Sequence, residues 1–465
     1  MDSRSAGVVV VGGGPAGYVA AITAAQKQQK VTLIEEGHLG GTCLNKGCIP
    51  TKVLARAAAI YEDYKMLDQF GFEKGELVIN WPRIQGRKEK IVATLRQGVG
   101  GLMRANKIEV LRGKAGFLSA SALSVTSGEG ENTVLQFSRA IIASGSSPAQ
   151  IPGFPVDEES VFSSTGILRL NNLPKSLVVI GGGVIGLEFA SIYSLLGAKV
   201  TVLEMLPQVL AGVDEEAARV AAGEMQKKGV QIWTGAKVEK IDRISADQVR
   251  VGFLQGESVR EVIAEKVLMA AGRTPNTRGL GLEKAGVSLE RGAIKVNSRM
   301  ETSVPGIFAA GDVIGGYMLA HVAFAEGAAA ALNAAGIEKR VSYQSVPACI
   351  YTYPEVAQVG LSEVQARQKY RDLKVGKFPL QANGKALING ETSGFVKIVT
   401  EPGYGEILGV SIVGHHATEL IAEAGLAISA ELTVEQLVET IHAHPTVSEA
   451  MREAGLVALG TPLHS

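Results

Sequence analysis

The chain has 465 residues, of which 46% are hydrophobic, enough to build the cores of about three domains. Its 46 basic residues balance 46 acidic ones, so no excess of charge indicates binding to nucleic acid or to an anionic membrane surface. No uninterrupted apolar stretch approaches the roughly 18 residues of a bilayer-spanning helix, and a strand-like run begins by Ala6, so we expect neither a membrane span nor a signal or transit peptide.

Three cysteines, Cys43, Cys48 and Cys349, are too few to form a disulfide framework in a chain of this length. Reducing compartments keep most thiols reduced, so a disulfide in this chain is expected to be chemical rather than structural. We therefore expect a cytoplasmic protein, or one of an organelle matrix if the sequence is the mature form of an imported protein. Cys349 is expected to act as a buried hydrophobic side chain.

Two segments share one pattern of apolar strand, glycine turn, helix, apolar strand and terminal acid. Uninterrupted apolar strands are typical of a parallel sheet that is covered on both faces. Glycines allow a tight turn and a close approach to a pyrophosphate at the helix start, and the acid binds ribose hydroxyls. An ordinary glycine turn is the alternative for one copy, but both copies carry every part of the pattern. The residues are Gly12, Gly14, Gly17 and Glu35 in the first copy, and Gly181, Gly183, Gly186 and Glu204 in the second.

Other signals divide the remainder of the chain. Amphipathic helices are predicted over 51–69 and 81–105. Prolines and a glycine within 148–155 indicate a domain junction. From about Val341, strand-like runs such as 394–399 alternate with helices and no nucleotide fingerprint occurs, which predicts a separate α+β domain. Strand-to-turn signals are found at 140–145, 266–273 and 306–313.

Cys43 and Cys48 stand five positions apart in the run Gly-Gly-Thr-Cys-Leu-Asn-Lys-Gly-Cys-Ile-Pro-Thr-Lys, residues 40–52. Two such cysteines can meet where a glycine-rich loop enters a helix, and the helix dipole stabilises a thiolate there. The alternatives are two structural cysteines or half of a zinc site. A zinc site needs about four ligands, and no further Cys or His cluster lies nearby in the sequence, so we expect no metal. Beside two nucleotide fingerprints, the pair favours redox chemistry.

With these motifs the chain resembles the dihydrolipoyl dehydrogenase family of class I pyridine nucleotide-disulfide reductases, nearly end to end. The resemblance rests on residues 40–52, on Gly311-Asp312 and on the run His442-Ala443-His444-Pro445-Thr446-Val447-Ser448-Glu449. It implies an α/β fold with two Rossmann-like dinucleotide-binding domains, for FAD and NAD, and a C-terminal α+β dimerisation domain. The implied boundaries are 1–147 for the first part of the FAD domain, 148–272 for the NAD domain, 273–340 for the segment that completes the FAD domain, and 341–465 for the dimerisation domain.

The resemblance also assigns roles around the flavin. It implies that Cys43 exchanges with substrate and that Cys48 lies against the flavin as the charge-transfer thiolate. It implies that Lys52 reaches the flavin and pairs with Glu188, whereas the residues alone allow an ordinary surface salt bridge of little energy. The other implied flavin contacts are Thr42, Ala115, Ser144, Gly145, Ser146, Asp312, Met318, Leu319, Ala320 and His321, and the other NAD contacts are Val238 and Gly272.

A second half of the site is predicted near the C-terminus. A histidine titrates near neutral pH and can take a proton from a dithiol, while a carboxylate can orient its ring. The family signature assigns His444 as this base and Glu449 as its partner, with His442 as the nearby competitor. In the family this segment reaches the cysteines of the other subunit, so the resemblance implies a homodimer.

Residues after the second fingerprint and at the C-terminus indicate the preferred nucleotide and the substrate. No arginine follows Glu204 to bind a 2′-phosphate, so NAD is favoured over NADP, which glutathione reductase usually prefers. Mercuric reductase generally ends in a cysteine pair, which residues 460–465 lack. The predicted activity is oxidation of protein-bound dihydrolipoamide through Cys43–Cys48 and FAD, with reduction of NAD. The alternative is another NAD(P)H-dependent flavin disulfide reductase of the glutathione or mercuric type. The implied partners are the lipoyl domains of 2-oxo acid dehydrogenase complexes or the glycine-cleavage carrier protein.

Two other classes compete with this prediction. A flavoprotein NADH oxidase or peroxidase usually relies on one redox cysteine, and a non-catalytic scaffold needs neither the cysteine pair nor the His-Glu signature. Two departures from the family pattern stand out. Lys46 lies between the cysteines where the family commonly has an apolar residue, and a cation there should favour thiolates. Ser144 replaces the usual threonine.

Overall fold

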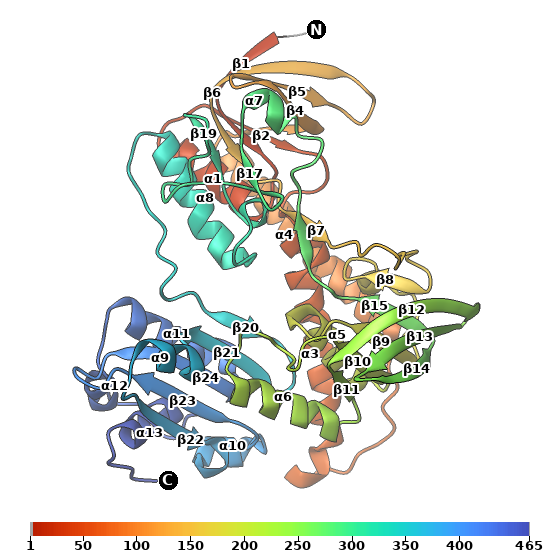
Figure 1. Ribbon diagram of the computed structural model, residues 1–465, viewed down its shortest axis with the longest axis vertical. Helices are drawn as coiled ribbons and strands as arrows, with labels where there is room; N and C mark the ends of the chain where they lie inside the picture. The colour runs from red at the N-terminus through yellow and green to blue at the C-terminus, as the bar shows by residue number, and fades with distance from the viewer. Residues whose placement is uncertain (1–2, 465) are drawn as a thin grey trace. The chain divides into compact units, whose positions relative to one another are not determined.

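The computed structural model describes residues 3–464 (Figure 1). The chain divides into two compact units, each made of three separate segments. The first unit comprises Met1–Val53, Arg83–Ala149 and Gly272–Ser342, and the second comprises Leu54–Pro82, Gln150–Ala271 and Tyr343–Ser465.

The first unit is built on a sheet with the strand order β3-β2-β1-β6-β5-β4, and β19 also pairs with β6. Strands β3, β2, β1, β6 and β19 pair in parallel with one another, whereas β5 pairs antiparallel with both β6 and β4. The strands are β1 (Ser3–Val11), β2 (Val31–Glu35), β3 (Glu109–Arg112), β4 (Lys114–Ser119), β5 (Ala122–Thr126), β6 (Asn132–Ile142) and β19 (Ile307–Ala309).

Strand β1 is buried on both faces, as its uninterrupted apolar run predicts. Val8 and Val10 lie in a core with alanines of α1 (Pro15–Gln26) and α8 (Ala320–Ala334). Val9 and Val11 lie in a second core with residues of β4 and β5. The first fingerprint therefore starts from a strand that cannot shift without exposing one of two cores.

The second unit contains a parallel sheet in the order β11-β10-β9-β15-β8 and an antiparallel three-stranded sheet in the order β12-β13-β14. The second fingerprint spans β9, α5 and β10. The elements are β8 (Val161–Ser163), β9 (Ser176–Ile180), α5 (Val184–Leu195), β10 (Lys199–Glu204), α6 (Glu215–Lys227), β11 (Gln231–Thr234), β12 (Ala236–Ser245), β13 (Gln248–Gln255), β14 (Ser258–Ala264) and β15 (Lys266–Met269).

The C-terminal part of the second unit is an antiparallel sheet in the order β20-β21-β24-β23-β22. Helices α11, α12 and α13 share one core with this sheet. The elements are β20 (Ala348–Ile350), β21 (Glu355–Gly360), α9 (Glu363–Lys369), β22 (Lys374–Pro379), α10 (Gly384–Asn389), β23 (Phe395–Thr400), β24 (Ile407–Gly414), α11 (Ala417–Ser429), α12 (Val434–Glu439) and α13 (Glu449–Ala458).

The predicted elements agree with the observed ones where the pattern was long. The helix predicted over 81–105 is α4 (Trp81–Ala105), and the one predicted over 51–69 is α3 (Cys48–Lys65), followed by a 3-10 turn at Leu67–Phe70. The antiparallel sheet β12-β13-β14 was not predicted, although Val249, Val251 and Phe253 alternate with more exposed residues along β13 and Gly256 lies in the turn to β14, which were the available signals.

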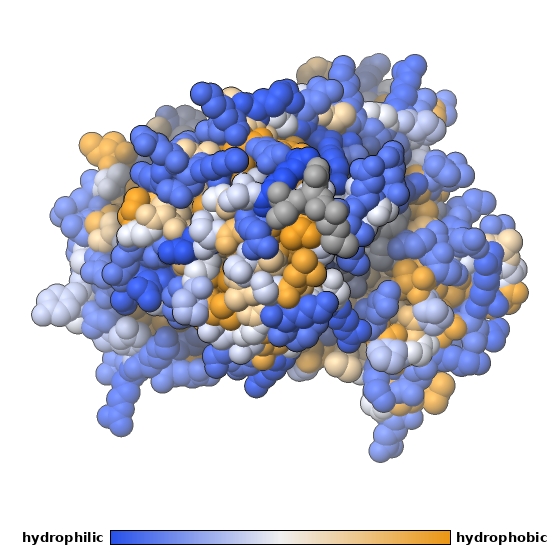
Figure 2. All heavy atoms as spheres, turned by 90° about the horizontal axis from the view of Figure 1, so that it is seen from above, coloured by the Kyte–Doolittle hydropathy of each residue, from blue (hydrophilic) through white to orange (hydrophobic). Residues whose placement is uncertain are grey.

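The surface is largely polar. On the face shown in Figure 2, hydrophilic side chains predominate and hydrophobic ones occur in scattered patches. Among the described residues, no helix is both long enough and apolar enough to cross a bilayer.

A buried lysine joins α6 to the C-terminal sheet within the second unit. Lys397 of β23 is 3% exposed and lies 2.8 Å from Asp214, the N-cap of α6, which is 2% exposed. Glu216 and Glu363 lie 3.3 and 3.4 Å from the same ammonium. Burial by itself lowers the pKa of Lys397, but the hydrogen bond to Asp214 and the nearby carboxylates reverse this effect and raise the pKa. The lysine therefore stays charged at neutral pH.

Replacing this lysine should strongly destabilise the protein. Lys397→Met leaves Asp214 buried without its cation, so we expect a loss of about 3–5 kcal/mol in the free energy of unfolding. The control is Lys377→Ala, because Lys377 pairs with Glu216 at 2.6 Å but its side chain is 45% exposed, and we expect a loss of about 0–1 kcal/mol. Denaturant unfolding of both variants measures the difference; equal losses would contradict the role given to Lys397.

Candidate active site

The first glycine turn, between β1 and α1, has the geometry of a nucleotide-binding loop. A Cβ on Gly17 would overlap the carbonyl oxygen of Gly12, and a Cβ on Gly12 would overlap that of Ala143, so only glycine fits at either position. At Gly14 the nearest atom to such a Cβ is Gly41 Cα, at 3.6 Å. Helix α1 begins after Gly14, and no side chain of the described residues caps its first amides. These amides can therefore bind a phosphate group.

The second glycine turn repeats this geometry. A Cβ on Gly186 would overlap the carbonyl oxygen of Gly181, whereas one on Gly183 would meet no described atom within 4 Å. Helix α5 begins after Gly183, again with no capping side chain among the described residues. The middle glycine of the motif thus faces the open space that a pyrophosphate needs.

The two terminal acids, Glu35 and Glu204, hold these turns in place. One oxygen of each carboxylate accepts a hydrogen bond from a glycine amide of its own turn, from Gly13 at 2.6 Å and from Gly182 at 2.5 Å. The other oxygen accepts from the amide two residues further along the chain, at 2.7 Å in both cases. Each oxygen has two lone pairs, so both acids can also accept ribose hydroxyls.

The loop that carries the first cysteine is held against the first glycine turn. Gly40 N donates to the carbonyl oxygen of Gly13 at 2.8 Å, and a Cβ on Gly41 would lie 2.5 Å from Gly14 Cα. Cys43 follows in α2 (Gly41–Lys46). The close backbone contact therefore sets the position of this cysteine relative to the predicted phosphate site.

Cys43 and Cys48 lie close together, with their side chains joined by a hydrogen bond. This bond, followed by burial and by the charge of Cys48, raises the pKa of Cys43, while the cation of Lys52 opposes the shift. The two thiols therefore titrate as a coupled pair, with Cys48 as the first residue of α3.

A partly buried arginine connects residues that the sequence assigned separately to the flavin. The side chain of Arg273 is 13% exposed, and its guanidinium donates to Ser146 Oγ and to Ser146 O, both at 2.7 Å. The same group lies 3.8 Å from Asp312, to which the Ser146 hydroxyl donates a hydrogen bond. Burial lowers the pKa of Arg273, and the charges of Asp312 and Cys48 oppose this shift. The cation is thus close enough to influence the Cys48 thiolate.

The remaining predicted flavin residues lie at strand and helix ends of the first unit. Ser144 Oγ donates to Asn276 O at 2.8 Å, and Asn276 N donates to Gly145 O at 2.9 Å, so this turn is tied to a neighbouring loop. Thr42 lies in α2, Ala115 is buried in β4, and Met318, Leu319, Ala320 and His321 lie at the start of α8. The predicted NAD contacts Val238 and Gly272 lie on β12 and just before β16 (Arg273–Pro275).

His444 and Glu449 form a hydrogen-bonded pair in the second unit. His444 Nδ1 lies 2.9 Å from Glu449 Oε1, and Thr446 N donates to Glu449 Oε2 at 2.8 Å. Partial burial opposes ionisation of Glu449, but the Thr446 amide and His444 outweigh it and lower the pKa of this carboxyl. With Nδ1 donating to the carboxylate, the proton-accepting atom is Nε2 of a side chain that is 78% exposed.

His442 has a different environment. Its Nε2 lies 2.9 Å from Glu423 Oε1 and its Nδ1 lies 2.9 Å from Thr440 O, while its side chain is only 5% exposed. Both nitrogens are thus occupied by neighbours, so this histidine has no free position for an incoming thiol. The geometry favours His444 over His442 as a proton acceptor.

Three further residues discussed from the sequence have distinct surroundings. Glu188 is 4% exposed and accepts a hydrogen bond from Tyr351 N at 3.1 Å, and its predicted pairing with Lys52 stays a prediction. Lys46 is exposed, and its charge adds to the burial that lowers the pKa of His38. Cys349 is half-buried against the C-terminal core.

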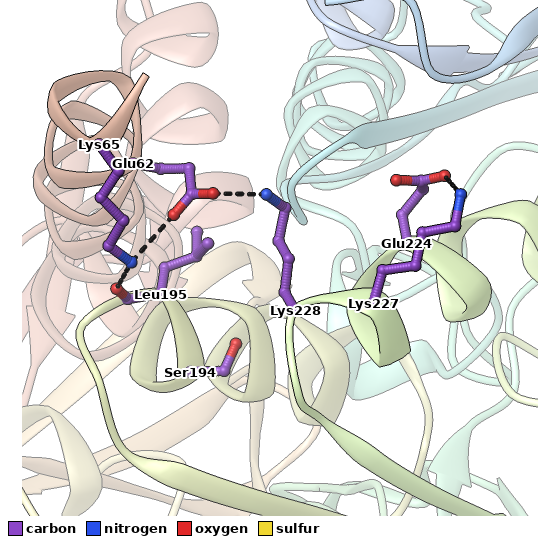
Figure 3. A pocket seen from close by; sticks show the side chains of 7 residues that line it. All are labelled: Glu62, Lys65, Ser194, Leu195, Glu224, Lys227 and Lys228. Carbon is purple, nitrogen blue, oxygen red and sulfur yellow. Dashed lines mark hydrogen bonds and ion pairs between the residues drawn. The ribbon is translucent and has the colours of Figure 1, made fainter. Parts of the chain in front are cut away.

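A pocket of about 350 Å³ in the second unit is lined by none of these predicted residues (Figure 3). Its charged side chains already pair: Glu62 lies 3.1 Å from Lys65 and 2.5 Å from Lys228, and Lys227 lies 2.7 Å from Glu224. We therefore do not regard it as the reactive site. Within residues 3–464, no group of three or more His, Cys, Asp or Glu side chains is arranged to hold a metal ion.

Sequence reasoning missed two residues of the first unit, Arg273 and Asn276. Arg273 ends the strand-to-turn signal at 266–273 and Asn276 follows it, and a cation directly after a glycine at a strand end was the available signal. Their partners Ser144 and Ser146 are more than a hundred residues away in the chain, so only the fold could identify them.

Comparison with known proteins assigns a family to this arrangement. Residues 6–327 match the family described as pyridine nucleotide-disulphide oxidoreductase, and residues 346–455 match the dimerisation domain of that family. A dihydrolipoyl dehydrogenase of Bacillus subtilis is 43% identical over 462 residues, covering 98% of this chain and 100% of that protein. One from Geobacillus stearothermophilus is 44% identical, covering 98% and 97%. The family resemblance and the α/β fold class predicted from the sequence are thereby confirmed.

Solved structures agree with this assignment. LpdA from Mycobacterium tuberculosis aligns with a TM-score of 0.90 and 29% identity, covering 98% of this chain and 99% of that one. The HOCl-induced flavoprotein disulfide reductase RclA from Escherichia coli, solved as a Cu(II) complex, aligns with a TM-score of 0.88 and 30% identity, covering 97% and 99%.

Removing the cation of Arg273 should make the thiolate form of Cys48 less stable relative to the thiol. In a Cys43→Ser background, where Cys48 is the remaining thiol of the pair, Arg273→Met should move the pH midpoint of the thiolate absorbance of the reduced protein upward by about one unit, because a nearby cation is lost. The exposed Arg278, in the same segment, provides the matched control Arg278→Met, which should leave the midpoint unchanged. An unchanged midpoint in Arg273→Met would rule out this electrostatic role.

Proposed function

Because the chain belongs to the pyridine nucleotide-disulphide oxidoreductase family, we propose that it is a dihydrolipoyl dehydrogenase. It oxidises protein-bound dihydrolipoamide to lipoamide and reduces NAD+ to NADH. The observation that carries this proposal is the hydrogen-bonded Cys43–Cys48 pair on the same chain as the His444–Glu449 pair. Relatives with this printed name, 41–44% identical over 98% of the chain, support the same activity.

Two dinucleotides fit the two glycine turns. We propose FAD at Gly12, Gly14, Gly17 and Glu35, and NAD at the equivalent residues of the second turn, because only glycine fits at the first and last positions of each motif and the helix amides are uncapped by described side chains. When bound, FAD carries two electrons from the dithiol to NAD+. Thr42, Lys52, Ala115, Ser144, Gly145, Ser146, Asp312 and residues 318–321 are proposed for the flavin, and Val238 and Gly272 for NAD.

The two cysteines perform the disulfide exchange. In the oxidised enzyme, a substrate thiolate attacks Cys43 Sγ, the Cys43–Cys48 bond breaks, and Cys48 leaves as a thiolate. The second substrate sulfur then attacks the substrate sulfur that is bonded to Cys43, and Cys43 leaves. This step forms the lipoamide disulfide and leaves both cysteines reduced. The raised pKa of Cys43 and the proximity of Arg273 to Cys48 support this division of roles, because they favour a neutral Cys43 beside an ionised Cys48.

His444 removes the proton that makes the substrate thiol nucleophilic. Its Nε2 accepts the proton, and the Glu449 carboxylate at Nδ1 stabilises the imidazolium that forms. The match of 346–455 to a dimerisation domain supports a homodimer, and we propose that His444 acts on the cysteines of the second copy. Lys52 is proposed to reach the flavin and to pair with Glu188.

The wider context follows from the substrate. We propose that the chain serves lipoyl domains of 2-oxo acid dehydrogenase complexes or the glycine-cleavage carrier protein. The domain boundaries 1–147, 148–272, 273–340 and 341–465 and a cytoplasmic location stay predictions. A glutathione- or mercuric-type reductase is the second candidate. It is disfavoured by Glu204 and by the absence of cysteines in 460–465, and the curated relatives named above do not support it.

A base substitution tests the proposal directly. His444→Gln should lower the rate of dihydrolipoamide oxidation with NAD+ by about 10²–10⁴-fold, because general-base catalysis is lost. NADH-dependent reduction of an artificial flavin acceptor should remain close to that of the parent enzyme, since it does not use the substrate dithiol. Parallel steady-state assays measure both rates. An equal fall in both would make His444 structural, and a parent enzyme more active with glutathione disulfide than with lipoamide would refute the proposed substrate.

The choice of nucleotide can be tested at the second terminal acid. Glu204→Gln keeps an acceptor oxygen for one of the two turn amides but removes the charge that repels a 2′-phosphate. The preference for NAD over NADP, measured as the ratio of the two kcat/KM values, should fall roughly tenfold, the factor that about 1.4 kcal/mol of charge repulsion represents. An unchanged ratio would mean that another residue sets the nucleotide preference.

A further inference from the structure

One buried side chain outside the assigned residues connects a neighbouring helix to the His444–Glu449 pair. Asn383 is 4% exposed and lies directly before α10. Its Oδ1 accepts a hydrogen bond from Ala386 N at 2.9 Å, and its Nδ2 donates to Thr446 O at 3.1 Å. An N–H must face a carbonyl and a side-chain oxygen must face an amide, so the two contacts together define the orientation of this amide.

The contact continues to the proposed base in two further steps. Thr446, whose carbonyl oxygen accepts from Asn383, donates its own amide to Glu449 Oε2 at 2.8 Å. The other oxygen of Glu449 lies 2.9 Å from His444 Nδ1. The carbonyl oxygen of Thr446 is thus bound by the buried Asn383 amide, and the amide of the same residue binds the Glu449 carboxylate.

The His444 ring needs support from neighbouring groups because it is exposed. Within its own chain the side chain of His444 is 78% exposed, so packing by that chain restricts its ring very little, and its orientation there depends on Glu449. Glu449 in turn depends on the position of the Thr446 amide. Thr446 Oγ1 donates to Ala443 O at 2.7 Å and lies 2.7 Å from Ser448 Oγ, but these bonds are internal to the loop. Asn383 is a buried group that anchors the loop to a different element.

We propose that Asn383 is a positioning residue for dihydrolipoamide oxidation, which holds the Thr446 amide so that Glu449 orients His444. This inference rests on the proposed function and adds to it a residue that never touches the substrate. Displacing a catalytic group by about 1 Å can cost on the order of 100-fold in rate, so the loss of one anchor should be measurable as a loss of kcat.

The test separates the helix cap from the loop anchor. Asn383→Ser keeps a side-chain oxygen for Ala386 N but is too short to reach Thr446. Its kcat for dihydrolipoamide oxidation by the full-length holoenzyme should fall roughly tenfold with KM almost unchanged, while NADH reduction of an artificial acceptor stays at the parent rate. Ser362→Ala is the matched control: Ser362 is a buried N-cap of α9 in the same unit, bonded to Gln365, and its loss should leave kcat at the parent value.

A double-mutant cycle distinguishes positioning from general structural damage. If Asn383 acts through Glu449, adding Asn383→Ser to Glu449→Gln should reduce kcat by less than about twofold beyond Glu449→Gln alone. Multiplicative losses, or a kcat for Asn383→Ser equal to that of Ser362→Ala, would overturn the proposal. If Asn383→Ser fails to fold, Asn383→Asp, which keeps the cap but faces Thr446 O with a second acceptor, should show the same loss of kcat; a parent-like kcat would refute positioning.

Failure of the proposed dihydrolipoamide activity would give a different result from failure of the role proposed for Asn383. It would appear as a parent enzyme that does not oxidise dihydrolipoamide, and the inference on Asn383 would fall with it. A parent enzyme that oxidises dihydrolipoamide and loses this activity in His444→Gln, but retains it in Asn383→Ser, would refute only the positioning role.

Discussion

The close backbone contact between two glycine pairs is the constraint on which the first half of the site depends. Gly40 N binds the carbonyl of Gly13, and Gly41 approaches Gly14 so closely that a Cβ there would lie 2.5 Å from Gly14 Cα. No larger residue fits, so the turn proposed for the flavin pyrophosphate and the loop that carries the reactive thiol share one rigid backbone. Residues distant from this contact can vary without separating the two functions.

Charged side chains at both glycine turns and in both halves of the site are oriented by hydrogen bonds to neighbouring groups. Glu35 and Glu204 were predicted as ribose ligands, and each also fixes its glycine turn through two amide bonds. Arg273 supplies a cation near Cys48 that is held by bonds to Ser146. In the second unit, Glu449 binds one amide and one histidine. In each case a charged group is satisfied by fixed backbone donors or acceptors, so its orientation is set before a ligand arrives.

The reactive groups differ in how they are held. Cys43 and Cys48 are partly buried and lie next to a packed sheet, whereas His444 is an exposed side chain on a loop. This exposure within a single chain is consistent with the proposal that His444 acts on the cysteines of a second copy. Few packing contacts hold an exposed ring in place. The hydrogen bonds from Asn383 to Thr446 and from Thr446 to Glu449 are proposed to restrain the orientation of His444 instead.

The sequence by itself determined the features that depend on local order: both fingerprints, the helix over 81–105, the cysteine pair and the His-Glu signature. These follow from periodicity, from residue type and from resemblance, all of which are read along the chain. It did not reveal the sheet β12-β13-β14, nor the roles of Arg273, Asn276 and Asn383. The partners of these three residues lie 127, 132 and 63 positions away, and a hydrogen bond over such a separation exists only after folding. Tertiary structure therefore decided which side chains support the reactive groups, because support requires proximity in space rather than along the chain.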